Sequence, residues 1–280
     1  MNTGNLSNSV ILVTGGTGSF GQAFTRAILK YDIKALRIYS RNEYLQWQMK
    51  QNFTDSRIRW MIGDVRDRDR LKTCLRGVDY VIHAAALKHV STGEYNPQET
   101  IKTNILGSVN IVDIAVEQKV KKVIGISSDK AVNPSCLYGS TKQIMEILFK
   151  EANRWSLPST AFSIVRPGNF LESYGNVLEI WALQARKGEI TITAEDMYRY
   201  FISVEDVAKK VIQFLEIMRG QEVFIPKMRE FSILDLAKAK YPDCKIKVIG
   251  KLGGEKLHEH LCSDDEQIID KGDYWVIENR

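Results

Sequence analysis

The fold of this chain is decided by the stretch Val10-Ile11-Leu12-Val13-Thr14-Gly15-Gly16-Thr17-Gly18-Ser19-Phe20-Gly21. Its apolar first half predicts a short buried strand, and its second half carries glycines at Gly-x-x-Gly-x-x-Gly spacing. Apolar residues then continue at helical spacing from Phe20 to Leu29. A strand, a glycine-rich turn and a helix in this order are typical of the start of a dinucleotide-binding domain, in which a pyrophosphate lies at the helix N-terminus.

The residues of this turn are the first candidates for cofactor binding. A glycine triplet alone often makes only a turn, and the flanking strand and helix are what favour a dinucleotide site here. The candidates are Gly15, Thr17, Gly18, Ser19, Phe20 and Gly21.

Ser40 and Arg41 follow the next predicted strand, Ala35 to Tyr39, where such domains contact the adenosine ribose. An acidic residue at this point would bind the ribose hydroxyls of NAD and repel a 2′-phosphate. A serine and an arginine suit NADP instead, because a guanidinium makes charge-assisted hydrogen bonds with phosphate. The alternative is an ordinary surface arginine.

Further apolar runs predict strands at 59–62, 80–83 and 122–126. Asp64, with Val65 beside it, would follow the first of these strands at its carboxyl end, where the carboxylate could bind the adenine amino group. The small residues Ala84 and Ala85 would let the end of the second strand approach the cofactor closely. Between the second and third strands we expect a loop at 87–97 and a long helix at 99–117.

Five strands that alternate with helices over about 130 residues argue for an α/β fold, a Rossmann-type doubly wound parallel sheet. A further strand at Thr160–Arg166 ends in Pro167-Gly168-Asn169, and beyond it the alternation becomes irregular. We therefore expect an NADP-binding Rossmann domain at 1–167. Residues 168–280 should form a smaller C-terminal substrate-binding lobe, interleaved with the first domain. The elements expected in this second part are helices at 176–187, 204–218 and 233–241, and strands at 190–193, 222–225, 245–249 and 274–277.

The chemistry is predicted to lie after the strand at 122–126. Tyr138 begins a helix in which Lys142 lies one turn later on the same face. A phenol titrates near pH ~10, and a neighbouring ammonium lowers that pKa by favouring the phenolate. Such a tyrosine can take the proton of a sugar hydroxyl while hydride leaves the carbon. The spacing alone usually marks an exposed helix face, but Asp129-Lys130 places an acid and a base beside the same strand end.

Composition excludes several classes of protein. With 44% hydrophobic and 26% charged residues the chain can bury a full core, and its four scattered cysteines form no Cys-x-x-Cys pattern for zinc or a disulfide framework. The polar segment Met1–Ser9 shows no signal pattern, and no apolar run approaches the ~18 residues of a membrane span. We expect a cytoplasmic protein. Its net charge of +5 is dispersed, which disfavours nucleic acid and suits an anionic substrate such as a nucleotide sugar.

Taken together, these motifs resemble the extended short-chain dehydrogenase/reductase superfamily, and more narrowly the bacterial nucleotide-sugar 4,6-dehydratases that act on UDP-N-acetylglucosamine. The resemblance covers nearly the whole chain and implies a homo-oligomer that retains NADP tightly. It rests on Thr14 to Gly21, Tyr39 to Arg41, Gly63 to Asp67, Ile82 to Val90, Glu94 to Pro97, Lys102 to Ile105, Ser128 to Ala131, Tyr138 to Lys142 and Gly254 to Glu259.

The resemblance implies a role for each catalytic candidate. Tyr138 would remove the C4 hydroxyl proton while hydride passes to NADP, and Lys142 would lower the pKa of the tyrosine and bind the nicotinamide ribose. Ser128 would hydrogen-bond the reacting oxygen. Lys130, as a neutral amine, would take the acidified C5 proton, and Asp129, kept protonated, would donate to the departing C6 hydroxyl. Hydride would then return to C6.

The resemblance also implies contacts with the substrate, from Lys88, His89, Asn104, Asn169, Arg199 and Glu255, with Lys88 near the cofactor as well. Lys88 and His89 are otherwise ordinary surface residues, and Asn104 a polar helix residue satisfied locally. No metal site is expected, because His258 and His260 lack a third ligand.

Two departures from the family pattern bear on substrate binding. Glu172-Ser173-Tyr174 stands where relatives typically show Gly-Ser-Arg, and an acidic residue there should weaken phosphate contacts. The chain also ends at Arg280, earlier than many relatives, which could trim the second lobe.

Two other functions stay open. A nucleotide-sugar 4-epimerase or reductase needs Tyr138 and Lys142 but no acid-base pair for water loss. A catalytically silent NADP-binding regulator or scaffold needs only the glycine turn and Arg41. Sequence does not fix the configuration at C5 of a dehydratase product, although Tyr138 and Asp129-Lys130 resemble the inverting enzymes.

Overall fold

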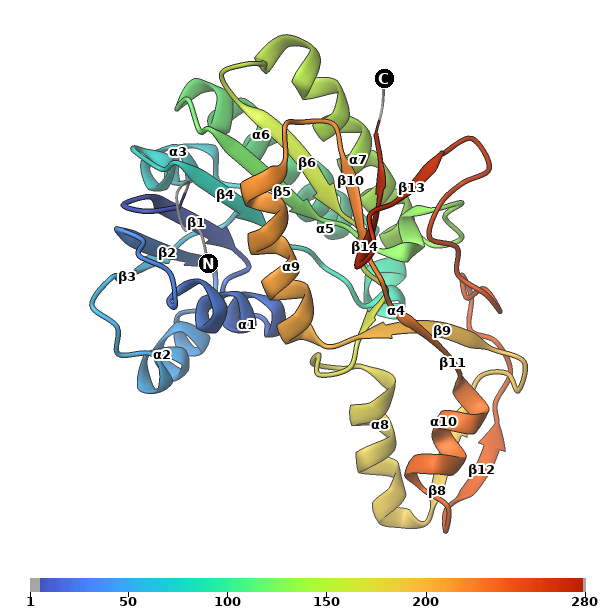
Figure 1. Cartoon of the computed structure of the whole chain (residues 1–280). Coiled ribbons are helices and arrows are strands. Elements are labelled where there is room, and N and C mark those ends of the chain that lie inside the picture. Colours follow the sequence, from blue (N-terminus) through green and yellow to red (C-terminus); the bar gives the residue numbers. More distant parts are fainter. Residues whose placement is uncertain (1–5, 279–280) are drawn as a thin grey trace.

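A nine-stranded sheet forms the centre of the molecule, as Figure 1 shows. The computed structural model describes residues 6–278, so the first five residues of the polar segment Met1–Ser9 lie outside it. The strands, in their order across the sheet, are β13 (Ile268–Asp270), β14 (Tyr274–Ile277), β10 (Val223–Pro226), β6 (Ala161–Val165), β5 (Lys122–Ile126), β4 (Tyr80–His83), β1 (Val10–Thr14), β2 (Ala35–Ser40) and β3 (Ile58–Ile62).

The sheet is parallel from β10 to β3, and β14 and β13 add an antiparallel edge. Strands β1 and β6 are buried along their whole length, which fits their continuous apolar sequences, because helices cover both faces of a doubly wound sheet. The predicted α/β fold with a Rossmann-type parallel sheet is therefore confirmed.

Two helical layers enclose this sheet (Figure 1). On one face α1 (Ser19–Ile28) and α9 (Val204–Ile217) pack through Phe24 and Val207 into one buried cluster. On the other face Phe149 joins a second buried cluster. The helices of this second face are α3 (Arg68–Leu75), α6 (Gly107–Glu117) and α7 (Leu137–Ser156).

A smaller lobe projects from the carboxyl end of the sheet (Figure 1). It has its own core around Trp181 and Phe201. Its elements are α8 (Val177–Gln184), β8 (Glu189–Ile192), α10 (Ile233–Lys240) and β12 (Lys245–Val248), with a three-stranded sheet of β7 (Asn169–Phe170), β9 (Tyr198–Ile202) and β11 (Arg229–Ser232) at its base. Residues beyond 168 do not all belong to it, because α9, β10 and β14 return to the main sheet.

Several helices differ from the sequence prediction. The predicted helix at 99–117 consists of α5 (Pro97–Ile101), one π-helical turn (Lys102–Leu106) and α6. The predicted loop at 87–97 contains α4 (Val90–Tyr95), and an unpredicted helix, α2 (Glu43–Asn52), follows β2. Only Gln46 and Met49 of α2 are buried, so its sequence carries little periodic apolar signal. Within residues 6–278, no helix is both long and apolar enough to cross a membrane.

Candidate active site

The glycine turn after β1 brings two strand ends together. Gly15 has φ +65°, and a Cβ built on it would lie 2.9 Å from the amide nitrogen of Ala85, after β4. The amide of Gly18 donates to the carbonyl oxygen of Gly15 at 3.0 Å, which closes the turn just before α1 begins at Ser19. The turn therefore leaves no room for a side chain at position 15 and exposes backbone where a flat or charged group could approach closely.

A cavity of about 270 Å³ opens beside this turn at the carboxyl ends of the strands. It brings together seven of the residues predicted to bind a cofactor: Gly15, Thr17, Ser40, Arg41, Asp64, Val65 and Ala85. It also contains residues that the sequence did not single out, namely Tyr39, Asn42, Leu45, Gly63, Ala86 and Thr103. The hydroxyl oxygen of Thr103 is buried without a hydrogen-bond partner among the described residues.

Arg41 and Asp64 both line this cavity and form an ion pair, with 3.6 Å between a guanidinium nitrogen of Arg41 and Oδ2 of Asp64. Burial acts to raise the pKa of Asp64, but hydrogen bonds from Arg66 and the charge of Arg41 hold that pKa below its usual value. The Asp64 carboxylate is thus an acceptor at one side of the cavity. About half of the Arg41 side chain is exposed, which leaves its guanidinium free to contact an anion.

The predicted acid-base residues lie together at the end of β5. Ser128 caps a short 3₁₀ turn at Asp129–Ala131, and its hydroxyl donates to Oδ1 of Asp129 at 2.8 Å. The ammonium of Lys130 donates to the same oxygen at 3.1 Å and to Oδ1 of Asn169 at 3.3 Å. Asp129 is fully buried, and its Oδ2 has no hydrogen-bond partner within residues 6–278. The cluster therefore joins an amine to a buried carboxyl that has one oxygen still unused.

Tyr138 and Lys142 lie one turn apart in the first turns of α7. Burial lowers the pKa of Lys142 to about 8, against a smaller opposing effect of Glu146. The expectation that Lys142 lowers the pKa of Tyr138 is corrected. In this structure burial raises the tyrosine pKa, the nearby Asp129 charge raises it further, and the hydrogen bond with Ser128 opposes the rise only in part. Loss of hydration is the largest cause of the raised Tyr138 pKa, and Lys142 is not among the groups that shift it.

Gly139 allows the 3₁₀ turn to pack directly on α7. A Cβ at this position would overlap the carbonyl oxygen of Lys130. The close approach fixes the backbone that carries Lys130 and Asp129 against the helix that carries Tyr138.

Asn104 lies in the π-helical turn and is 2% exposed. Its side-chain oxygen accepts from the amide of Leu87 at 2.8 Å, and its nitrogen donates to the carbonyl of Leu87 and to Thr141 Oγ1, both at 3.0 Å. Asn104 is therefore not satisfied within its own helix. It holds the segment after β4 against α7, and the substrate contact predicted for it stays a prediction.

The segment 172–175 lies against three residues that were predicted to bind ligands. Lys88 Nζ donates to the carbonyl of Tyr174 at 2.9 Å, and the amide of Tyr174 donates to Ser19 Oγ at 3.2 Å. A Cβ at Gly175 would overlap the ring of His89. Lys88, His89 and Ser19 thus meet this segment at the edge of the dinucleotide turn.

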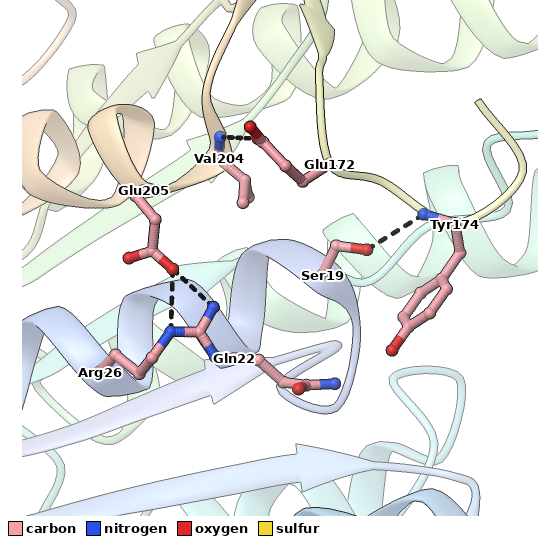
Figure 2. A pocket seen from close by; sticks show the side chains of 7 residues that line it. All are labelled: Ser19, Gln22, Arg26, Glu172, Tyr174, Val204 and Glu205. Atoms are coloured by element: carbon pink, nitrogen blue, oxygen red, sulfur yellow. Dashed lines mark hydrogen bonds and ion pairs between the residues drawn. The ribbon is translucent and has the colours of Figure 1, made fainter. Parts of the chain in front are cut away.

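Figure 2 shows a second cavity, of about 330 Å³, under this segment. Glu172 points to the N-terminus of α9, where Oε2 accepts from the amide of Val204 at 3.1 Å. The helix dipole stabilises a carboxylate at this place. Glu172, the acidic residue that departs from the family pattern, therefore has a hydrogen-bond partner within the chain. The residues around the cavity are Ser19, Gln22, Arg26, Glu172, Tyr174, Val204 and Glu205.

Arg199 and Glu255 are occupied by backbone groups. Arg199 is 8% exposed, and its guanidinium donates to the carbonyl oxygens of Tyr198, Lys256 and Leu257. Glu255 accepts from the amide of Leu252 at 3.0 Å in a local turn. The substrate contacts predicted for these two residues stay predictions. Their observed contacts shape the segment that follows β12.

One acidic residue near the cluster was missed by the sequence analysis. Glu259 is 5% exposed, and its Oε1 lies 3.7 Å from Lys130 Nζ. The available signal was its position in the motif Gly254–Glu259, from which only Glu255 had been selected.

The comparisons with known proteins agree with this geometry. The chain is 46% identical to a UDP-N-acetylglucosamine 4,6-dehydratase (inverting) of Campylobacter jejuni subsp. jejuni serotype O:23/36 (strain 81-176), over 91% of this chain and 78% of that protein. It is 38% identical to a UDP-glucose 4-epimerase of Rickettsia canadensis (strain McKiel), over 96% of this chain and 83% of that protein.

A solved structure is also similar over nearly the whole length. The X-ray structure of Pen from Bacillus thuringiensis superimposes with a TM-score of 0.94 at 36% sequence identity, covering 98% of this chain and 90% of that one. The model of the family described as polysaccharide biosynthesis protein matches residues 11–277. The chain belongs to this polysaccharide biosynthesis protein family.

Proposed function

We propose that this protein is a nucleotide-sugar 4,6-dehydratase that converts UDP-N-acetylglucosamine to a UDP-4-keto-6-deoxy-N-acetylhexosamine. The observation that carries the proposal is the contact between Lys130 and the fully buried Asp129, beside Ser128 and Tyr138. Oxidation at C4 needs a tyrosine and a lysine, whereas loss of water across C5 and C6 also needs a second base and an acid. The relatives named UDP-N-acetylglucosamine 4,6-dehydratase (inverting) support the same choice.

The cavity beside the glycine turn fits a nicotinamide dinucleotide. Gly15 has no side chain, so the backbone of the turn can approach a pyrophosphate closely, whereas a Cβ at this position would collide with Ala85. We assign NADP rather than NAD to this site. Ser40 and Arg41 would hold the 2′-phosphate, and Asp64 would accept from the adenine amino group. When bound, the cofactor accepts a hydride from C4 of the sugar and later returns it to C6.

In the first step the phenolate form of Tyr138, which bound substrate and cofactor must favour, takes the proton of the C4 hydroxyl. Ser128, which lies in the same cluster, would hydrogen-bond the same oxygen. Burial lowers the pKa of Lys142 to about 8, so its ammonium form can release a proton at modest cost. This step gives a ketone at C4.

In the second step the ketone makes the C5 proton acidic. Lys130 Nζ, as a neutral amine, takes this proton, the C6–O bond breaks, and Asp129, in its protonated form, gives its proton to the leaving oxygen, which departs as water. A C5=C6 double bond conjugated with the ketone remains, and it accepts a hydride at C6 and a proton at C5. Asn169 holds the Lys130 amine during this step, at 3.3 Å in this structure.

Proton NMR of the purified protein with NADP and UDP-N-acetylglucosamine in D₂O tests the proposal. We expect a new C6 methyl signal and deuterium at C5. The ring couplings should show inversion at C5, in line with the relatives named inverting. A spectrum that stays unchanged with cofactor bound would overturn the dehydratase assignment.

An epimerase or reductase is the second candidate, supported by the relatives named UDP-glucose 4-epimerase. It would produce a C4 epimer or reduced sugar without a mass decrease of about 18, the mass of the water lost in dehydration. A silent NADP-binding regulator would bind the cofactor and leave every nucleotide sugar unchanged. Mass spectrometry of the same reaction mixture separates these three outcomes.

We also propose that the protein is a homo-oligomer. Apolar side chains are exposed on the neighbouring helices α5 and α7 and on the π-helical turn between them in space, including Leu106 at 51% and Ile147 at 53% exposure. A face of this kind commonly meets another chain. Light scattering after size-exclusion chromatography should show an oligomer for the natural chain and a smaller particle for Ile147→Glu. A monomeric natural chain would contradict the proposal.

A further inference from the structure

Glu259 is a buried acid that none of the proposed steps uses. It lies in the segment after β12, far from Lys130 in the sequence, and this segment is tied back to the sheet. Arg166 donates to the carbonyl of Leu261 at 2.9 Å and to both carboxylate oxygens of Glu266, at 2.8 and 2.9 Å. The tie places Glu259 beside the end of β5 with 5% of its surface exposed.

The Lys130 amine lies between two buried carboxyl groups. Its Nζ is 3.1 Å from Asp129 Oδ1 and 3.7 Å from Glu259 Oε1. Each of these carboxyl groups keeps one oxygen that is buried without a hydrogen-bond partner in the described part of the chain. Glu259 Oε2 lies 3.3 Å from Lys256 Nζ, close enough for an ion pair, and the same ammonium donates to the carbonyl of Val132 at 2.7 Å.

A buried glutamate at this position carries a cost in stability. Burying a carboxylate removes its hydration, and an incompletely paired one recovers this free energy only in part. Asp129 Oδ2 and Glu259 Oε2 have no hydrogen-bond partner in the described part of the chain, and the Lys130 amine lies between the two carboxyl groups. Such an arrangement is useful when a charge develops at the amine.

We propose that Glu259 is a positioning residue that holds the Lys130 amine opposite Asp129 and stabilises the positive charge that this amine gains as it takes the C5 proton. The proposal rests on the proposed function. It adds a residue that acts after C4 oxidation and not before it. No bond to Glu259 forms or breaks, and its carboxylate acts through Lys130.

Kinetics of Glu259→Gln test the catalytic part. We expect kcat to fall about 100-fold, the scale of a misplaced catalytic group, while KM changes little. Because C4 oxidation should still proceed, absorbance at 340 nm from reduced cofactor should accumulate in a single turnover. Glu259→Asp, which keeps the charge, should recover part of kcat. Asp264→Asn, an exposed carboxylate in the same segment, is the matched control and should behave like the natural chain.

A second measurement does not depend on the reaction. Acetic anhydride modifies neutral amines, and peptide mass spectrometry gives the rate at Lys130 relative to the exposed Lys121. Removing the Glu259 charge should destabilise the Lys130 ammonium, so Glu259→Gln should be modified several-fold faster at Lys130 than the natural chain or Asp264→Asn.

An unchanged labelling rate at Lys130 would overturn the proposal, whatever the substrate proves to be. Equal loss of cofactor reduction and of product would overturn it as well, because that pattern marks a general defect. If labelling rises but no 4-keto-6-deoxy product forms even in the natural chain, the proposed function fails and the contact with Lys130 stands.

Discussion

The Lys142 ammonium donates a 2.6 Å hydrogen bond to the backbone carbonyl oxygen of Ile126, at the last residue of β5. The lysine is 3% exposed, so the strand end and the helix α7 share a buried cation. The bond fixes the position of the amine before any ligand arrives. The free energy that the buried charge requires should be visible in the pH dependence of stability.

We predict that Lys142→Met flattens the rise of stability with pH. The pKa of Lys142 is about 8 in the folded protein and 10.5 in a model peptide. As the pH rises through this window the folded state releases a proton that the unfolded state keeps, so the free energy of unfolding increases. Between pH 7.5 and 10 the natural chain should gain about 2 kcal/mol more than the variant in urea denaturation. Parallel pH curves would show that Lys142 is not the group responsible.

Tyr138→Phe should lower kcat about 10³-fold, within the usual range for loss of a general base. Binding of UDP-N-acetylglucosamine, measured by titration calorimetry, should change little, because the ring is retained. The raised tyrosine pKa of the ligand-free protein means that substrate and cofactor must supply the interactions that favour proton transfer. A variant that still forms product at the natural rate would remove Tyr138 from the mechanism.

Arg41→Ala should weaken NADP binding by about 10- to 100-fold, since hydrogen bonds to charged groups contribute about 1.5–3 kcal/mol. Affinity for NAD should stay nearly unchanged, which makes NAD the internal control in a fluorescence titration. Equal weakening of both cofactors would indicate that the exposed guanidinium only supports Asp64.

Gly139→Ala should separate cofactor binding from catalysis. The added methyl group would meet the Lys130 carbonyl and push the 3₁₀ turn away from α7, so we expect kcat to fall about 100-fold. The cavity at Gly15 and Arg41 lies outside this contact, so NADP affinity should be retained. Ser140→Ala at the next position is the control and should keep its activity. Full activity of Gly139→Ala would show that the turn can shift without consequence.

Much of the sheet could be predicted because its strands are continuous apolar runs. β1, β4 and β5 begin and end at the predicted residues, since burial on both faces leaves no polar position inside them. The helix α2 could not be predicted in this way. It exposes Tyr44 and Trp47 at 61% and 56%, so hydrophobicity does not mark its buried face.

The acid-base cluster was predictable where its residues are close in the sequence. One strand-turn-helix unit carries all five predicted catalytic residues, and the structure brings them together: Ser128, Asp129, Lys130, Tyr138 and Lys142. Glu259 reaches the same place through the tertiary packing of a distant segment, which no local pattern encodes. The net pKa of Tyr138 was misjudged for a related reason, because the loss of hydration depends on everything that packs around the ring.

The tie between Arg166 and the residues that follow β12 has a consequence for the order in which the molecule matures. The dinucleotide turn and its cavity are built from residues 15–103, which leave the ribosome early. The segment that contains Glu259 and the Arg166 partners Leu261 and Glu266 is made near the end of synthesis. Strand β14, which pairs with β10, follows it. The residues of the cofactor cavity are therefore complete in a nascent chain before the segment that carries Glu259 has been made. That last segment then packs against a sheet that is already formed.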